Sequence, residues 1–278
     1  MSKYKNCEVF ILNAFLEVIK LNLKLCFHYK WGFAITLLIQ PFAVLINIAL
    51  FSRIYEFNGM SSIKGYSLDQ MIWYFTVVNF IWAFIFNHTD SNISYKIISG
   101  NLAIDLLRPM SLFRFELGIA VGFRIVGILI EVIPGVALYS LIYYPKFLTA
   151  LSIMRFLIVV ISSFTLHYLL NFMIGLMSFL LKNNSSLSAL KWFVLSFAGG
   201  AFMPLEFLPD WVNRVNNYLP FKYMFYWPIQ FFLNKAGAQE WSELLHVFSI
   251  QLVWVLVMYI LCKILWNKVA NKFCAVGG

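Results

Sequence analysis

Apolar residues fall along this 278-residue chain in six stretches that are each long enough to cross a membrane. A spanning helix needs about 20 mostly apolar residues to cross about 30 Å of hydrocarbon. The third and fourth stretches are longer, which predicts tilt or protrusion. The pattern predicts an all-α, polytopic membrane protein with one transmembrane domain over residues 1–278. The predicted spanning helices cover residues 31–54, 68–86, 116–143, 151–181, 187–208 and 244–265.

The first 30 residues show a different pattern, a narrow polar stripe on a wide apolar face. At 100° per residue, five polar side chains fall within an arc of about 80°. They are Asn13, Glu17, Lys20, Lys24 and His28. This predicts a helix that lies in the membrane interface, with Lys20 and Lys24 toward anionic headgroups. The alternative is a seventh spanning helix, which two lysines and a glutamate in mid-segment disfavour.

The loop over residues 87–114, between the second and third spans, predicts a short amphipathic helix. One of its faces carries Ile93, Ile97, Ile104 and Leu107, and the other carries Ser94, Asn101, Asp105 and Arg108. Gly100 interrupts this helix and Pro109 ends it. Such a helix can dock in the groove of a partner protein. The alternative is a helix that rests on the inner leaflet.

Residues 199–235 contain four of the eight prolines, at positions 204, 209, 220 and 228. Proline breaks helices, so we expect a series of short helices. Interfacial aromatic residues follow the same segment, which predicts half-inserted pieces on the outer face. Broken backbone at membrane depth is tolerated only against protein or a wet cavity, so this segment is a candidate gate. The alternative is an ordinary extracellular loop.

Composition supports a membrane protein, with 62% hydrophobic residues, 12% charged residues and a mean hydropathy of +0.79. Soluble domains are nearer half apolar and a quarter charged. The net charge of +9 comes from single basic residues between apolar runs, so lipid explains it and nucleic acid is not an expected partner. Thirteen of the 21 Lys and Arg flank the predicted cytoplasmic side and six flank the outer side. This bias predicts cytoplasmic N- and C-termini.

The four cysteines and the N-terminal residues carry no further signal. No two cysteines have C-x-x-C spacing, so neither zinc nor a redox pair is indicated, and we expect reduced, apolar fillers. They are Cys7, Cys26, Cys262 and Cys274. A cleavable signal peptide is not expected, since no short apolar run precedes a small-residue cleavage site.

Two stretches resemble signatures of the permease subunit of type-2 ABC exporters. Residues 98–109, ISGNLAIDLLRP, are similar to the pattern sG-x-L-x-x-x-LlrP of one branch of that superfamily. Residues 202–221, from Phe-Met-Pro through Leu-Pro-Asp-Trp to Leu-Pro-Phe, are similar to its pattern fP-x-x-x-lP-x-w…lPf. The order and spacing of the two stretches match along essentially the whole chain.

The resemblance implies two six-helix permease halves above two cytosolic ATPase subunits. It implies that a coupling helix sits in a cleft of the ATPase, a role carried to Ile97, Gly100, Leu102, Asp105, Leu107, Arg108 and Pro109. It implies an extracellular gate at Gly199, Gly200, Met203, Pro204, Leu208, Pro209 and Trp211. The second half is either an identical or a related chain. Because the sequence lacks G-x-x-x-x-G-K-[ST], ATP and Mg²⁺ are expected on the partner ATPase and no cofactor on this chain.

Catalytic and metal sites are not indicated, because the four histidines lack any spacing of such sites. Polar groups inside spans are costly unless paired, so they either hold the fold together or line a pathway. They are Gln40, Asn47, Arg124, Glu131, His167 and Asn171. Arg124 and Glu131 lie seven residues apart and cannot pair directly within their helix. Pro134 frees the carbonyl of Ile130, which predicts a kink.

Together these features predict the membrane half of an ATP-driven exporter in the plasma (inner) membrane. By analogy with the family, the substrate is an amphiphile: a lipid, a peptide or a drug-like molecule. The alternatives are a secondary carrier, an importer membrane subunit and an integral membrane enzyme. A carrier often carries a matching helix break in each half, whereas this sequence has one proline-rich break.

Overall fold

The computed structural model describes residues 2–28, 30–181 and 183–270, except for some side chains of the first two helices and that of residue 270. The side chains of Cys7, Cys26 and Gln40 and the whole of Cys274 lie outside this description, and Cys262 is buried. Almost all regular structure is helical. The α-helices are α1 Ser2–His28, α2 Lys30–Asn58, α3 Leu68–Ile85, α4 Thr89–Ile98, α5 Leu102–Leu106, α6 Leu112–Gly127, α7 Ile133–Ile142, α8 Ala150–Leu181, α9 Ser185–Phe197, α10 Asp210–Asn216, α11 Tyr226–Phe232 and α12 Trp241–Ala270.

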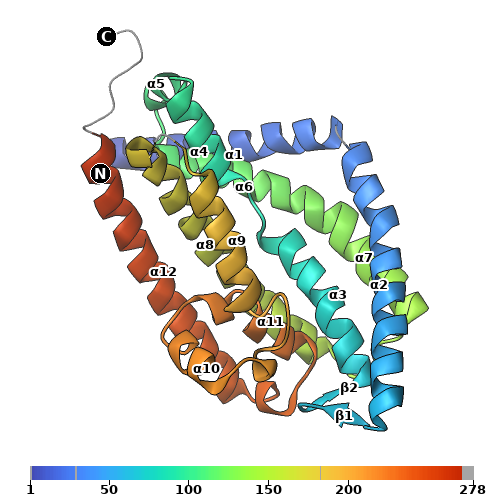
Figure 1. Ribbon diagram of the computed structural model, residues 1–278. Coiled ribbons are helices and arrows are strands. Elements are labelled where there is room, and N and C mark those ends of the chain that lie inside the picture. The colour runs from blue at the N-terminus through green and yellow to red at the C-terminus, as the bar shows by residue number, and fades with distance from the viewer. Residues whose placement is uncertain (1, 29, 182, 271–278) are drawn as a thin grey trace.

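Short elements connect these helices. A hairpin of β1 (Ser62–Ile63) and β2 (Tyr66–Ser67) follows α2 and is a small departure from the predicted all-α fold. The others are a π-helical turn, η1 (Ile128–Val132), and three 3₁₀ turns, η2 (Leu205–Phe207), η3 (Phe221–Tyr223) and η4 (Ala236–Ala238). In Figure 1, α5 and α1 lie at one end of the molecule, and the hairpin and α10 lie at the other.

Among the described residues, four helical segments are long and apolar enough to cross a membrane, and α1 is not one of them. They cover residues 68–85, 112–142, 150–181 and 241–269. The predicted fifth span, residues 187–208, is wrong as one continuous helix. Its helix α9 has 13 residues, about 20 Å at 1.5 Å per residue. It ends because Gly200 takes the left-handed conformation, with φ of +82°.

The predicted third span is interrupted where Pro134 disturbs it. Proline has no N–H to bond the carbonyl four residues earlier, and its ring crowds that carbonyl. The chain responds with the π-helical turn η1, in which the Ile133 N–H donates to the carbonyl of Ile128. Glu131 lies half-buried on this turn. The helix is therefore irregular just before Pro134, where the sequence predicts a kink, and the irregularity is a single π-helical turn.

The centre of the molecule is α8, which packs against α12, α4, α11 and α3. Gly175 of α8 allows the closest of these approaches, because a Cβ there would lie 2.9 Å from the Ile93 Cβ. The side chain of Ile93 is fully buried against α8. As a result α4, which follows the α3 span, is fixed to the central helix of the bundle.

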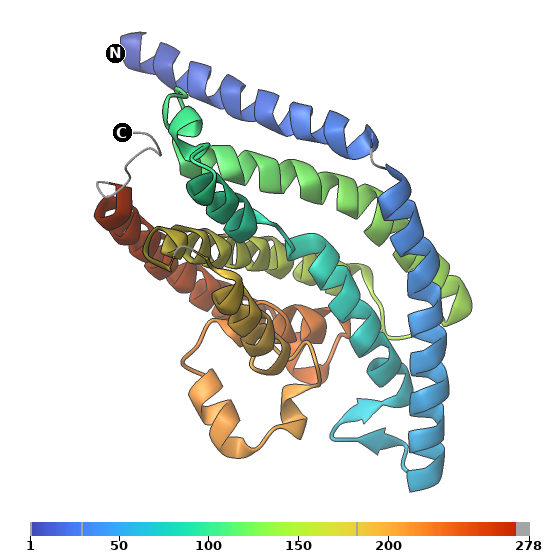
Figure 2. The ribbon, with the colours of Figure 1, turned by 45° about the horizontal axis from the view of Figure 1, so that its top comes forward.

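Helix α1 packs along α6 (Figure 2) through two glycines one turn apart. A Cβ on Gly118 would lie 2.9 Å from Val18 Cγ1, and a Cβ on Gly122 would lie 2.8 Å from Asn22 Cβ. This is small-xxx-small packing, in which missing side chains let two helix backbones approach. The hydrophobic pattern did not predict this contact, although the sequence contains the spacing Gly118-x-x-x-Gly122.

The polar stripe predicted on α1 is confirmed as an exposed face. Asn13, Glu17, Lys20, Lys24 and His28 are all exposed, and the Lys20 Nζ lies 2.7 Å from Glu17 Oε1. With α6 against its other side, α1 presents this stripe away from the bundle. Its position in the membrane interface stays a prediction.

The packing predicts opposite effects for two glycine-to-alanine changes in α6. Gly122→Ala should lower the melting temperature of the detergent-solubilised protein, because the new Cβ would also meet the backbone oxygen of Ile19 at 3.1 Å. Such overpacking costs about 1–3 kcal/mol. Gly127→Ala is the matched control, since its nearest atom would lie at an ordinary 3.5 Å and alanine favours a helix by about 1 kcal/mol. Equal melting temperatures for the two variants would contradict the α1–α6 contact.

Candidate functional site

Residues 87–111, here called the α4–α5 segment, form two helices that meet at a sharp turn. The turn is at Gly100, whose φ of +76° lies in the left-handed region that glycine adopts without strain. The interruption predicted at Gly100 is confirmed, but the common faces predicted on both sides of it are wrong. Ile93 and Ile104 were expected on one face, yet Ile93 is buried and Ile104 is exposed, because the turn re-aims α5.

The charged residues of this segment hold α5 against α4 and α6. Lys96 Nζ lies 2.6 Å from Asp105 Oδ2 on α5 and 2.6 Å from Glu116 Oε1 on α6. Arg108 Nε lies 3.1 Å from Asp105 Oδ1, and both cations lie over the ring of Phe115. Glu116 is fully buried, so its carboxylate depends on Lys96 for compensation.

The same arrangement leaves apolar side chains exposed at the tip. Leu107 is 86% exposed, whereas Leu102, five residues earlier, is fully buried beneath it. The exposed apolar side chains of the segment are Tyr95, Ile98, Ile104, Leu106 and Leu107. The segment is therefore a rigidly held projection with an apolar surface.

The residues predicted to couple to an ATPase divide into two groups. Leu107 and Pro109 are exposed, and Arg108 is partly exposed beside its ion pair. Leu102 and Asp105 are buried and hold the segment, Ile97 is half-buried and Gly100 forms the turn. Only the first group can contact a partner directly.

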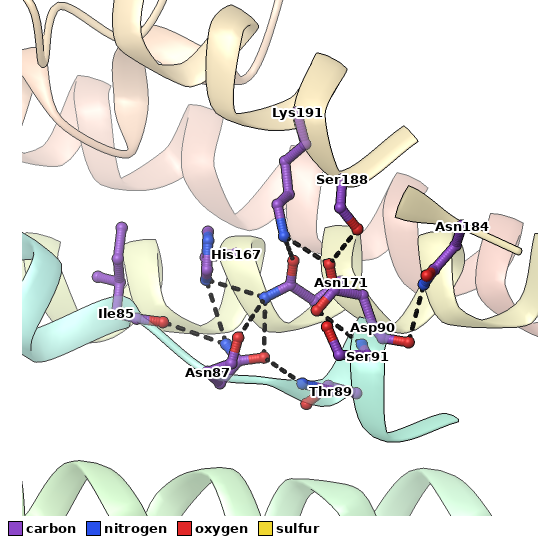
Figure 3. Close-up of polar contacts among 10 residues, drawn as sticks. All are labelled: Ile85, Asn87, Thr89, Asp90, Ser91, His167, Asn171, Asn184, Ser188 and Lys191. Carbon is purple, nitrogen blue, oxygen red and sulfur yellow. Dashed lines mark hydrogen bonds and ion pairs between the residues drawn. The ribbon is translucent and has the colours of Figure 1, made fainter. Parts of the chain in front are cut away.

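A buried polar network joins the start of this segment to α8 and α9 (Figure 3). Lys191 Nζ of α9 lies 2.7 Å from Asp90 Oδ2 and donates to Asn171 Oδ1 at 2.7 Å. Ser188 Oγ donates to the same carboxylate oxygen at 2.7 Å, and Asn184 Nδ2 donates to the Asp90 carbonyl at 2.9 Å. Helix α9 thus meets α4 at the carboxylate of Asp90, and its Lys191 also joins Asn171 of α8. We call the set Asn87, Asp90, His167, Asn171, Asn184, Ser188 and Lys191 the Asp90–Lys191 network.

The α8 half of the network surrounds Asn87, which follows the end of α3. Asn171 Nδ2 donates to the Asn87 carbonyl at 3.1 Å and to its Oδ1 at 2.9 Å. His167 Nδ1 lies 3.1 Å from Asn87 Nδ2 and 3.3 Å from Asn171 Nδ2. The imidazole thus lies between the side-chain amides of Asn87 and Asn171. His167 and Asn171 therefore order the α3–α4 connection rather than line an open cavity.

The carboxylate of Asp90 is ionised in this setting. Burial by itself raises the pKa of Asp90. The ammonium of Lys191 and the hydroxyl of Ser188 lower it by more than burial raises it, so the pKa lies below its ordinary value. Sequence reasoning missed this pair and counted Lys191 as a cytoplasmic flanking charge. A signal was present, because Lys191 is the one charged residue in the apolar run 187–205, and a lone ionisable group in such a run calls for a partner.

The remaining polar residues predicted inside spans have separate positions. Arg124 Nη1 donates to the carbonyl of Ala83 at 2.7 Å, which caps the C-terminal end of α3 and places Arg124 beside the Asp90–Lys191 network. Asn47 lies half-buried on α2 and Glu131 on η1, away from the network. Among the described residues, no group of three His, Cys, Asp or Glu could hold a metal ion.

At the opposite end, residues 199–235 form the predicted series of short helices, here called the outer segment. Glu206 accepts hydrogen bonds from Tyr66 of the hairpin at 3.0 Å and from Tyr226 at 2.8 Å. The carbonyl of Gly200 accepts from Tyr74 of α3 at 2.6 Å. The outer segment is therefore tied to both the hairpin and α3 by tyrosine hydroxyls, and no sequence pattern pointed to Glu206.

The predicted gate residues are spread over this segment rather than gathered at one point. Gly199 and Pro204 are buried, and Met203 and Leu208 are half-buried. Pro209 and Trp211 are exposed, with Trp211 at the start of α10. Gly199 accepts from the Tyr226 N–H at 3.0 Å, so the end of α9 is bonded to the start of α11.

These observations define a multi-pass helical membrane protein with a rigid apolar projection at one end and a tyrosine-bonded outer segment at the other. The family described as ABC-2 family transporter protein matches residues 38–277, and the chain belongs to it. It is thus a membrane-embedded permease of an ABC transporter, which works with an ABC ATPase and is not itself that ATPase. The resemblance seen in the sequence is confirmed. No curated protein and no solved structure matches the chain.

The network predicts a pH-dependent defect in Lys191→Met. Without Lys191 the Asp90 carboxylate is buried and uncompensated, which costs about 3–5 kcal/mol. Burial then raises its pKa, so the variant should lose stability as pH rises from 5 to 8, measured as the melting temperature in detergent. In the wild type the pKa is lowered, so this stabilisation is complete above about pH 5 and is lost only as pH falls through the lowered pKa.

The control for that variant is the double change Asp90→Leu with Lys191→Met, which removes both charges. It should recover part of the lost stability and show no pH dependence of its own between pH 5 and 8. A single variant as stable at pH 8 as at pH 5 would show that the ion pair does not hold this site.

Proposed function

We propose that this chain is one permease half of an ATP-driven exporter that moves an amphiphilic substrate outward. Two separate ATPase subunits would bind ATP and Mg²⁺, and a second permease chain, identical or related, would complete the pathway. Family membership supports the permease role. The observation that supports the rest is the projecting α4–α5 segment, because it exposes apolar side chains such as Leu107 outside the segments that are long and apolar enough to span a membrane.

The proposed topology has six crossings, with both termini in the cytoplasm of the plasma membrane. Four crossings are the apolar segments described above. The other two crossings are α2 and α9. Helix α2 has 29 residues and reaches about 44 Å. Helix α9 is short and is continued toward the outer surface by the first turns of the outer segment. Helix α1 then lies in the cytoplasmic interface, at the same end as α5 (Figure 1).

The α4–α5 segment has the form that a coupling element requires. Leu107 and its exposed apolar neighbours would enter a cleft on the ATPase, as in helix-in-groove recognition. Lys96 and Leu102 prevent α5 from folding back when it is pushed, since one bridges α4, α5 and α6 and the other fills the core beneath. A displacement of the ATPase would therefore move α4 and α5 together.

The Asp90–Lys191 network offers a mechanical path from this segment to the outer face. A movement of α4 is transmitted to α9 by the Asp90–Lys191 ion pair, which is 2.7 Å long and buried on both sides. Gly199 and Gly200 follow the end of α9 at Phe197, and their carbonyls are bonded to Tyr226 and Tyr74. Displacing α9 would strain these bonds and open the outer segment, while ATP hydrolysis would restore them.

Leu107→Glu should abolish capture of the ATPase while the permease still folds. The charge would have to enter an apolar cleft, which costs at least about 2 kcal/mol and lowers affinity at least about thirtyfold. The measurement is a mild-detergent pull-down of the tagged chain expressed with its native neighbours, with the Walker-motif ATPase quantified by mass spectrometry. Wild type should retain the ATPase in stoichiometric amount.

Two further variants isolate the effect. Phe57→Glu alters an equally exposed apolar side chain, 91% exposed at the end of α2, and should leave ATPase recovery unchanged. Leu102→Glu buries a charge and should lower the yield of folded permease itself. Full ATPase recovery with Leu107→Glu would overturn the coupling role of this segment.

Topology can be tested with single cysteines in a chain whose four native cysteines are replaced. Trp211→Cys should react with a membrane-impermeant maleimide in intact cells, because Trp211 is 66% exposed on the outer segment. Leu107→Cys should react only after the membrane is permeabilised. The reverse pattern would invert the proposed orientation.

A further inference from the structure

A cavity of about 760 Å³ lies where the α4–α5 segment joins α6. Its walls come from the start of α6, from Phe172 of α8 and from the last turns of α12. Leu107, on which the proposed coupling chiefly depends, does not line it, although Leu106, Arg108 and Pro109 of the same segment do. Its volume is that of a small-molecule site.

The floor of the cavity is aromatic. Phe113 packs edge-on against Phe172 and Tyr259, with ring centroids 5.1 and 5.7 Å apart. Trp266, seven residues after Tyr259, lies about 10 Å further along the same face of α12. Leu117 completes an apolar wall. Such a surface suits hydrocarbon, and Tyr and Trp suit the level at which hydrocarbon meets headgroups.

Three cations line the same cavity: Arg108, Arg114 and Lys263. Arg108 is largely neutralised by Asp105, at 3.1 Å. In the described part of the chain, no carboxylate forms an ion pair with Arg114 or Lys263, and both are exposed. The cavity therefore carries a net positive charge of about two beside an apolar floor, where a basic pocket between membrane helices favours an anionic headgroup.

We propose that this cavity binds the headgroup of an anionic phospholipid, with Arg114 and Lys263 at the phosphate and the acyl chains along α6 and α12. The leaflet follows from the proposed topology, on which this part of the inference rests: α5 and the end of α12 are cytoplasmic, so the lipid is in the inner leaflet. The bound lipid would also contact Leu106 and Pro109 of the α4–α5 segment, since both line the cavity. Lipid occupancy would then brace the coupling projection.

Native mass spectrometry of the detergent-solubilised protein, purified with its ATPase, tests the site by titration with phosphatidylglycerol and phosphatidylcholine. We expect phosphatidylglycerol to bind at least tenfold more tightly. The double variant Arg114→Ala with Lys263→Ala should weaken phosphatidylglycerol about thirtyfold, because each cation near an anionic headgroup contributes about fivefold. Phosphatidylcholine binding should change little.

The matched control is Arg214→Ala with Lys268→Ala, which removes one exposed arginine and one exposed lysine that do not line the cavity. It should bind phosphatidylglycerol like wild type. Unchanged melting temperatures would show that both double variants fold. Equal loss in the two double variants, or equal affinity for the two lipids, would overturn the proposed site.

Inorganic phosphate and glycerol 1-phosphate are tested as competitors in the same binding experiment. Competition by either at the concentration of the lipid would show a phosphate site with no lipid specificity, and would overturn the proposal. The binding assay requires no orientation and no coupling. If phosphatidylglycerol binds but the Leu107→Glu experiment fails, the coupling role is disproved and the lipid site remains. If phosphatidylglycerol binds but the cysteine experiment fails, the assignment to the inner leaflet is disproved and the lipid site remains.

Discussion

The buried carboxylate of Asp90 is the constraint on which the arrangement of this permease depends. A buried charge is tolerated only where an opposite charge and hydrogen bonds compensate it, and here these come from Lys191 and Ser188 of α9. Asn171 of α8 accepts from the same ammonium, so α8 and α9 cannot shift independently of α4. This buried ion pair is thus also where the α4–α5 segment, the central helix and the helix leading to the outer segment are joined.

Around this point the structure divides into stiff and yielding parts. The α4–α5 segment is stiff, because Lys96 bridges two carboxylates and Gly175 lets α4 lie directly against α8. The outer segment consists of short helices joined through tyrosine hydroxyls and the carboxylate of Glu206, and a hydrogen bond to a charged group contributes about 1.5–3 kcal/mol. On the proposed coupling role, a force applied at α5 would be transmitted through α9 to these hydrogen bonds.

The sequence predicted the parts of this fold that depend on periodicity and on proline. It located α3, α8 and α12, the stripe on α1, the irregularity before Pro134 and the short helices after Gly200. It failed where one backbone angle changed the direction of a helix: Gly100 was seen as an interruption, but the face that α5 would present could not be predicted. It also overran the end of α9, because apolar residues continue past Phe197 while the helix does not.

Most of the site depends on contacts distant in sequence. His167 and Asn171 were predicted as polar groups in need of partners, but Asn87 lies 80 and 84 residues away from them, and Lys191 lies 101 residues from Asp90. No local pattern encodes such pairings. The family resemblance supplied the coupling role of residues 97–109, but only burial separates Leu102, which supports the segment, from Leu107, which faces outward.

The glycine contact between α1 and α6 has a consequence for the synthesis of the protein. Asn22 leaves the ribosome 100 residues before Gly122, its contact on α6. At about 5–20 residues per second, α1 therefore waits about 5–20 seconds for the helix against which it packs. Throughout that interval its apolar face needs cover, and its lysine stripe needs headgroups. The amphipathic pattern of α1 is thus suited to holding the nascent helix at the bilayer surface until α6 has been synthesised.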